Sequence, residues 1–354
     1  MLREDLADAT PFAASKGWFD NFAARNCLSL RRRTSIAQKD PDQLIAKIVA
    51  YIMRVRRLRR LHSYDNANII VMGETAVWCD MTSNTTLELK GANTVSMKST
   101  GHDKFRVSAC LTAKADGTKL KPLIVFLGAV KEVAALNKEF GGKCIVASSS
   151  NAWMNIELTE LYVNKVLGAL SFKRRLFAWD TFECHLTSTV KKSLTDKRID
   201  TVYIPGGCTS HIQAPDVCWN KPFKSHCAVK YDEWLATDGI HNVTDCGPPP
   251  RREIVKWVIE SWAQLSSELI AKSFVVCALA GAVDGSTDGE ITCLKEGKPC
   301  SAGREMLQNQ MELIDTVEEN PFTPSSGDID AACPAVLQIE ESDTEEDIDL
   351  NILY

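Results

Sequence analysis

Hydrophobic periodicity changes from helical to strand-like near residue 67, and this change restricts the chain to folds that combine a sheet with helices. After it, short apolar or alternating runs predict strands at residues 69–72, 104–113, 120–128, 176–179 and 201–204. Helical stretches near 157–170 and from 187 onward separate the later strands. A run of strands followed by alternating strands and helices indicates an α/β fold, with a mixed sheet flanked by helices.

The first 60 residues are basic and carry two predicted helices, with 13 Lys and Arg residues against 6 Asp and Glu residues. One helix begins after Ser15, a candidate N-cap, and the other after Asp40 and Pro41. A basic, helical front end is typical of a nucleic-acid contact, although a solvated helix face carries the same charge. Cations crowd the last turns of the second helix at Arg54, Arg56, Arg57, Arg59 and Arg60.

The far end of the chain is acidic. Residues 312–354 hold 13 Asp and Glu residues and no Lys or Arg. Apolar residues at helical spacing in residues 254–274 predict a helical extension, and regular pattern fades from about residue 300. We therefore predict a disordered acidic C-terminal tail, which is either solvated or a docking segment for protein partners.

Length and composition exclude several classes of protein. The chain has 354 residues, 45% of them hydrophobic, which suits one large domain or two smaller ones. No apolar run approaches the roughly 18 residues of a membrane span, and the start lacks the apolar segment of a secretion signal, so we expect a soluble, intracellular protein without a membrane partner. The 13 cysteines are scattered without a C-x-x-C pair, which favours reduced thiols over disulfides or zinc.

Two acids near the ends of predicted strands are candidate metal ligands. Asp180 directly follows an apolar strand. A carboxylate at this end of a strand can point into the ligand-binding crevice of an α/β sheet. An Asp that ends a strand is, however, more often a cap or turn residue. Asp216 and Asn220 are four residues apart, so they would share one face of a helix and could flank one cation. Pro222 argues against an uninterrupted helix there.

Three strings carry a family resemblance: GET at 73–75, WDTFECHLT at 179–187 and GGCTSHIQAPDVCWNKPFK at 206–224. They resemble the motifs of the DDE superfamily endonuclease domain of pogo-like transposases, over residues of about 65–235. Ahead of them, KGWFDNFAARNCLSLRRR is similar to the last helix of the centromere-protein-B type helix-turn-helix of these transposases. The resemblance spans roughly residues 15–290 and implies a ribonuclease-H-like fold.

The chemistry that this resemblance implies needs three carboxylates around two divalent cations, Mg²⁺ or Mn²⁺. One cation activates the attacking water or 3′-hydroxyl, and the other stabilises the leaving oxygen of a phosphodiester. By resemblance the second and third carboxylates are Asp180 and Asp216, whereas the first position is Gly73. Glu74 adjoins this position, but alternate residues of a strand point to opposite faces. The resemblance therefore implies impaired catalysis, with the two remaining acids holding at most one weakly bound Mg²⁺.

The resemblance also implies DNA as a partner and the nucleus as the location. The arginines of residues 54–60 could add contacts to phosphates that are independent of base sequence. Glu183 places negative charge near the expected path of DNA. The oligomeric state stays open. The candidate DNA-binding residues are Lys16, Trp18, Arg25, Arg31, Arg32 and Arg33.

The leading hypothesis is a transposase-derived nuclear protein that binds nucleic acid but has lost catalysis. The alternatives are an active Mg²⁺-dependent endonuclease completed by Glu74 or another acid, a protein-interaction scaffold, and a decayed gene product. The predicted organisation is a partial helix-turn-helix segment, a basic connecting helix, a DDE endonuclease-like core, a helical C-terminal extension and a disordered acidic tail, at residues 1–36, 37–64, 65–235, 236–292 and 293–354 respectively.

Overall fold

The computed structural model describes residues 15–26, 41–81, 105–128, 131–168, 170–237 and 248–310. The chain divides into two compact units, Met1–Gln38 and Lys39–Tyr354. In the first unit the structure describes helix α1 (Lys16–Arg25), which begins as predicted, because the hydroxyl of Ser15 accepts a hydrogen bond from the Trp18 amide at 3.2 Å. All the other described elements belong to the second unit.

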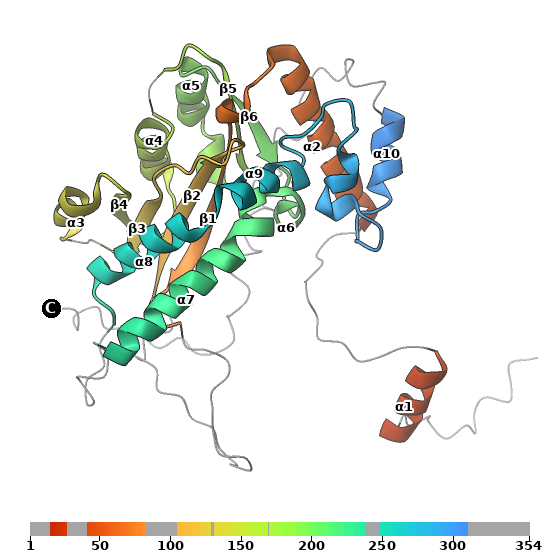
Figure 1. Ribbon diagram of the computed structural model, residues 1–354, viewed down its shortest axis with the longest axis horizontal. Helices are drawn as coiled ribbons and strands as arrows, with labels where there is room; N and C mark the ends of the chain where they lie inside the picture. Colours follow the sequence, from red (N-terminus) through yellow and green to blue (C-terminus); the bar gives the residue numbers. More distant parts are fainter. Residues whose placement is uncertain are drawn as a thin grey trace, which may run out of the picture. The chain divides into compact units, whose positions relative to one another are not determined.

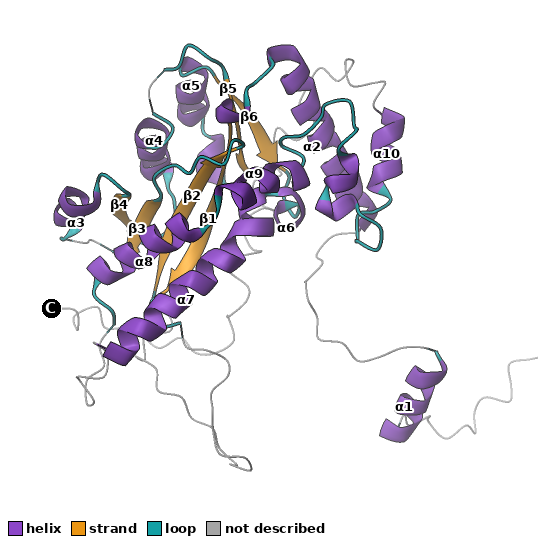
Figure 2. Cartoon of the chain, in the orientation of Figure 1, coloured by secondary structure: helices purple, strands orange, loops and turns teal. Residues whose placement is uncertain are grey.

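The second unit is built on a six-stranded mixed sheet with the order β4-β3-β2-β1-β5-β6 (Figure 2). The strands β1, β2 and β3 form an antiparallel meander, β4 lies parallel to β3, and β5 and β6 continue the sheet in parallel from β1. The predicted mixed α/β sheet is therefore confirmed. The strands are β1 (Ile69–Trp78), β2 (Arg106–Lys114), β3 (Leu123–Leu127), β4 (Ile145–Ser149), β5 (Arg175–Asp180) and β6 (Ile199–Ile204).

Helices cover both faces of the sheet (Figure 1). The longer helices are α2 (Pro41–His62), α3 (Val133–Phe140), α4 (Ile156–Lys165), α5 (Ser188–Asp196), α7 (Asn220–Thr237), α8 (Arg251–Gln264), α9 (Ser267–Val276) and α10 (Gly303–Gln310). The short turns are η1 (Asn66–Asn68), η2 (Glu183–Leu186), α6 (Thr209–Ile212), the π-helical η3 (Pro215–Trp219), η5 (Asp288–Glu290) and η6 (Thr292–Leu294).

Alternate residues of the strands divide the core into two layers. Val71 packs in the layer formed with α2, α7, α8 and α9, and its neighbour Met72 packs in the layer formed with α4 and α5. This division follows from the period of two of a β-strand, in which successive side chains point to opposite faces. The face toward which a β1 residue points therefore decides which helices it contacts.

Helix α2 is part of the core of the second unit, and two of its arginines bind other segments of the fold. Arg56 is only 4% exposed and pairs with Asp288. Arg59 donates a hydrogen bond to the Gly281 carbonyl at 2.7 Å. The prediction that the arginines of residues 54–60 contact phosphate is therefore wrong for Arg56 and Arg59, because both hold the segment that follows α9.

Order extends further toward the C-terminus than we predicted. Residues 293–310, which we assigned to the disordered tail, include η6 after its first residue and the whole of α10. Leu294 and Leu307 are 1% and 0% exposed, and Gly303 lies against Leu294, Ile45 and Val49. These sparse apolar residues show no clear period in the sequence, and they are buried because α2 provides a surface for them. Residues 311–354 lie outside the described residues.

Within the described residues, no helix is long and apolar enough to cross a membrane. The cysteines of the same residues are free thiols, and all except Cys218 are buried.

We predict that Arg56→Ala lowers the free energy of unfolding by about 3–5 kcal/mol, because it leaves the buried Asp288 carboxylate without a counter-charge. The double variant Arg56→Ala, Asp288→Ala should lose less, since neither charge is then left alone. Denaturant unfolding measures both, with Gln43→Ala, which changes an exposed residue of the same helix, as the control. Equal losses in the single and double variants would contradict the prediction.

Candidate functional site

Gly73 lies in β1 and Asp180 is the last residue of β5, and these two strands are neighbours in the sheet. Their parallel pairing ends with Val71 opposite Ala178, and Gly73 and Asp180 each follow two residues later on their own strands. Both fall on the face of the sheet that packs against α7 and α9, as their positions alternate with residues of the other layer. The structure therefore brings together the first and second positions of the predicted site.

Asp216 enters the same region from η3, a π-helical turn that packs against β1. Such turns are rare and frequently mark functional sites. The Asn220 amide donates a hydrogen bond to the Asp216 carboxylate at 3.3 Å, in line with the predicted spacing of four residues. Asp216 and Asn220 do not share one regular α-helix, because Asp216 lies in the π-helical η3 and Asn220 is the first residue of α7. Pro222 lies in the first turn of α7, where a missing amide proton is tolerated, and α7 runs on to Thr237.

The carboxylates of Asp180 and Asp216 influence one another electrostatically. Asp216 reaches the surface, but the protein packed around its carboxyl group removes part of its hydration. This desolvation, followed by the negative charge of Asp180, raises the pKa of Asp216 to about 6, against the lowering effect of Lys224. Asp180 and Asp216 are therefore close enough for the charge of Asp180 to shift the pKa of Asp216.

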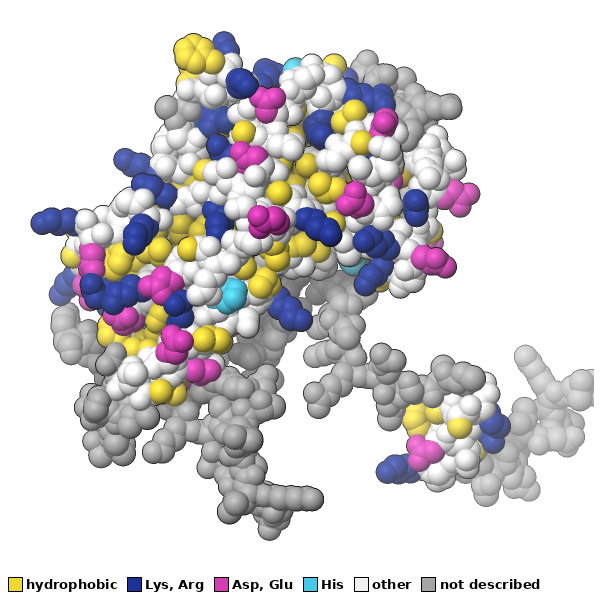
Figure 3. Space-filling model, viewed as in Figure 1, with side chains coloured by type: hydrophobic (Ala, Val, Ile, Leu, Met, Phe, Trp, Pro, Cys, Tyr) yellow, Lys and Arg dark blue, Asp and Glu magenta, His cyan; other side chains and the backbone are white. Residues whose placement is uncertain are grey.

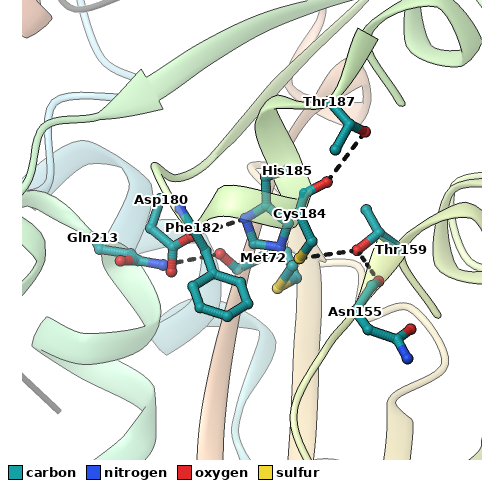
Figure 4. Close-up of polar contacts among 9 residues, drawn as sticks. All are labelled: Met72, Asn155, Thr159, Asp180, Phe182, Cys184, His185, Thr187 and Gln213. Atoms are coloured by element: carbon teal, nitrogen blue, oxygen red, sulfur yellow. Dashed lines mark hydrogen bonds and ion pairs between the residues drawn. The ribbon is translucent and has the colours of Figure 1, made fainter. Parts of the chain in front are cut away.

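A buried histidine occupies the immediate surroundings of Asp180 (Figure 4). His185 Nδ1 lies 2.8 Å from Asp180 Oδ1, and the Phe182 amide donates to the same oxygen at 3.1 Å. The His185 ring is 2% exposed and stacks on Trp179 with 4.0 Å between ring centroids. Asp180 therefore already has two donors from the protein.

His185 and Asp180 shift the pKa values of one another. Burial lowers the pKa of His185, but the negative charge of Asp180 and the hydrogen bond between them outweigh this effect and raise it to about 10. Burial likewise pushes the pKa of Asp180 upward, but the His185 charge and hydrogen bond hold it below its usual range. These shifts favour an imidazolium paired with a carboxylate at neutral pH, an arrangement in which a protein cation compensates the second acid.

The position of the missing first carboxylate is filled by other side chains. A Cβ atom added to Gly73 would lie 2.5 Å from Pro215 Cβ and 2.8 Å from Pro215 Cγ. It would also lie 3.4 Å from the Gln213 amide nitrogen, which donates a hydrogen bond to the Met72 carbonyl at 3.1 Å. The space beside Gly73 is therefore packed rather than open.

Glu74 does not take the place of the missing acid. It pairs across the sheet with Cys110, whose side chain packs in the layer of α4 and α5, so Glu74 points to the face opposite that of Gly73 and Asp180. Burial raises the pKa of Glu74 to about 7, and the positive charge of His185 limits this rise. The predicted direction of its side chain agrees with the structure.

The described residues do not fit a site for two divalent cations. No cluster of three or more His, Cys, Asp or Glu side chains with suitable geometry occurs among them. Gly73 offers no ligand, and one oxygen of Asp180 is engaged by His185 and the Phe182 amide. Mg²⁺ binds through one or two carboxylates together with waters and substrate phosphates, so weak binding of a single ion is the most that Asp180 and Asp216 support.

The candidate DNA-binding residues fall in two groups. Lys16, Trp18 and Arg25 are exposed on α1. The other three, Arg31 to Arg33, lie outside the described residues. On the face of the second unit seen in Figure 3, Lys and Arg side chains are interspersed with acids rather than gathered in one patch. Glu183, at the start of η2, is exposed.

Sequence reasoning missed three residues of this region: His185, Gln213 and Pro215. The order of WDTFECHLT offered a signal for His185, because a short turn after a strand returns a side chain to the strand end. Gln213 and Pro215 are next to Asp216 in the chain, but nothing in their spacing indicates that they contact β1.

Comparison with known proteins identifies the domain. Residues 104–274 match the DDE superfamily endonuclease family. The protein called "Pogo transposable element with KRAB domain" is 30% identical over 283 residues in Homo sapiens and 29% identical over the same length in Mus musculus. Each alignment covers 78% of this chain and 46% of the relative, so the chain spans about half the length of these relatives.

Solved structures of Mos1 transposase are more distant. The Mos1 paired-end complex with left transposon end matches with a TM-score of 0.46 and 10% identity, covering 82% of this chain and 71% of that one. The catalytic domain of Mos1 mariner transposase matches with a TM-score of 0.36 and 10% identity, covering 76% and 98%.

The acid at the end of β5 and the acid of η3 both lie within the residues that match the DDE superfamily endonuclease family. The comparisons therefore place a DDE superfamily endonuclease domain in a chain that is similar to pogo transposable-element relatives.

We predict that Asp180→Asn lowers the free energy of unfolding by about 1–3 kcal/mol near pH 7, since it removes the partner of a buried imidazolium, while the 32% exposure of the Asp180 side chain screens the pair. His185 has a pKa of about 10 in the folded protein and an ordinary value of 6.5, so its contribution is complete below about pH 6.5 and is lost as the pH rises through about 10.

Thermal unfolding from pH 6 to 10.5 tests this prediction. The difference in midpoint between the native protein and Asp180→Asn should shrink toward the alkaline end, whereas Asp196→Asn, at an exposed position of α5, should show no such trend. A difference that stays constant across this range would count against a charged His185.

Proposed function

We propose that this chain is a nuclear, nucleic-acid-binding protein derived from a pogo-like transposase and that it has lost strand cleavage. The observation that carries the proposal is the packing at Gly73. The first carboxylate is absent and Pro215 fills its place, so one of the three ligands needed for two cations is missing. The remaining acids are compensated by protein cations, Asp180 by His185 and Asp216 partly by Lys224.

Two features support DNA as the partner. The pogo-like domain belongs to a class of DNA-processing proteins, and α1 exposes Lys16, Trp18 and Arg25. Exposed cations on a helix gain affinity for DNA by releasing the counterions of phosphates. Because the proposed partner is DNA, we propose the nucleus as the location.

We expect no nicking of supercoiled plasmid above background with Mg²⁺ or Mn²⁺, because losing one of three metal-binding carboxylates weakens transition-state stabilisation by several kcal/mol, or roughly a thousandfold in rate. Asp180→Ala should therefore leave the background unchanged. Cutting that disappears in Asp180→Ala would instead support the alternative of an active endonuclease. The comparison between the two proteins separates real activity from contamination.

We expect the full chain to bind duplex DNA with an affinity that falls steeply with salt. Replacing Lys16 and Arg25 by Ala should reduce the slope of log affinity against log salt by about 2, at roughly 0.9 per phosphate contact removed. Fluorescence anisotropy with a labelled duplex measures the slope. The matched control replaces Lys138 and Lys143, two exposed lysines at α3, by Ala and should leave the slope unchanged.

Two outcomes of this titration would count against parts of the proposal. No binding of the native chain at moderate salt would favour the alternative of a protein-interaction scaffold. An unchanged slope in the Lys16, Arg25 variant, with binding intact, would move the DNA contact away from α1.

A further inference from the structure

We infer that Pro215 holds the former metal site closed, so that restoring the first carboxylate alone cannot rebuild it. This inference rests on the proposed loss of catalysis, because it concerns why the loss is not reversed by one substitution. Gly73 and Pro215 act as a steric pair in which the absence of a side chain on β1 allows the start of η3 to lie directly on the strand.

The distances at Gly73 leave no room for any side chain. Its added Cβ would meet Pro215 Cβ at 2.5 Å, and real Cβ atoms essentially never come closer than 3.0 Å to such a neighbour. The obstructing atoms belong to a ring fused to the backbone, so no change of rotamer moves them aside. Only a displacement of β1 or of η3 would relieve the contact.

The requirement for glycine at position 73 comes from this contact and not from the backbone conformation. Gly73 lies within a regular β-strand and has no left-handed φ angle, in contrast to Gly117 at +90° or Gly281 at +96°. Among the other glycines without a left-handed φ angle, a Cβ at Gly142 or Gly206 would meet nothing within 4 Å, whereas one at Gly141 would meet the Asn137 carbonyl oxygen of its own helix at 2.4 Å. The closeness to Pro215 is thus a specific packing feature.

Displacing Pro215 would also displace the third acid. Asp216 is the next residue of the same π-helical turn, and its carboxylate must stay near Asp180 to share a cation with it. An aspartate at position 73 would therefore move Asp216 away from the site that it is meant to complete. In this backbone, the first carboxylate and a correctly placed third carboxylate exclude one another.

A double-mutant cycle in stability tests the steric pair without any metal. Gly73→Ala should lower the thermal midpoint of the full chain by roughly 3–10 °C, because overpacking a filled core is destabilising. The same substitution should cost clearly less in a Pro215→Gly background, which removes both obstructing carbons. Gly142→Ala is the matched control, and it should leave the midpoint nearly unchanged. A loss from Gly73→Ala of the same size in both backgrounds would overturn the inference.

Calorimetric titration with Mn²⁺ supplies the second readout. Gly73→Asp alone should bind Mn²⁺ no more tightly than the native chain, whereas Gly73→Asp with Pro215→Gly should bind roughly tenfold more tightly or better. The gain should vanish when Asp180→Ala is added. Tight, Asp180-dependent binding by Gly73→Asp alone, with the thermal midpoint preserved, would overturn the inference.

The outcomes distinguish this inference from the proposed function. Asp180-dependent nicking by the native chain would contradict the proposed loss of catalysis, but it would not alter the stability cycle at Gly73 and Pro215. A failed stability cycle with an inactive native chain would contradict only the role of Pro215. If Gly73→Asp does not fold, the cycle built on Gly73→Ala still decides the question.

Discussion

The parallel pairing of β1 with β5 is the constraint on which the site depends. It aligns Val71 with Ala178, two residues before Gly73 and Asp180, and a slip of one residue would turn β1 side chains to the opposite layer. Helical segments cover this part of the sheet, and Pro215 of η3 packs directly against Gly73. The place where three carboxylates would bind two cations therefore holds two carboxylates and a proline.

Charge balance explains how the remaining acids persist without a metal. A carboxylate that loses hydration is unstable unless a positive group or hydrogen-bond donors replace the water. His185 and the Phe182 amide supply these to Asp180, and Lys224 opposes the rise in the pKa of Asp216. Protein groups thus offset part of the cost of placing these two acids close together, although the charge of Asp180 still raises the pKa of Asp216.

Local pattern was sufficient for β1, β2, β3, β5 and β6, because strand signals are short-range, whereas the pairing of Asp180 with Asp216 was predicted from the family motifs. It was not sufficient for β4, a five-residue strand that pairs only with β3, or for Pro215, whose contact with Gly73 joins distant parts of the chain. A glycine in a strand indicates a close approach of some other group but does not identify it. The contact that closes the site therefore appears only in three dimensions.

The number of Lys and Arg residues in the basic front end overstates the positive charge that is exposed for contact with DNA. Arg56 pairs with Asp288 and Arg59 binds the Gly281 carbonyl, so part of the basic front end stabilises the fold. A cation that is already neutralised and buried releases no counterions from DNA, and it contributes neither affinity nor salt dependence. Among the described residues, the exposed charges of α1 are therefore better placed for phosphate contact than the denser arginine cluster of α2.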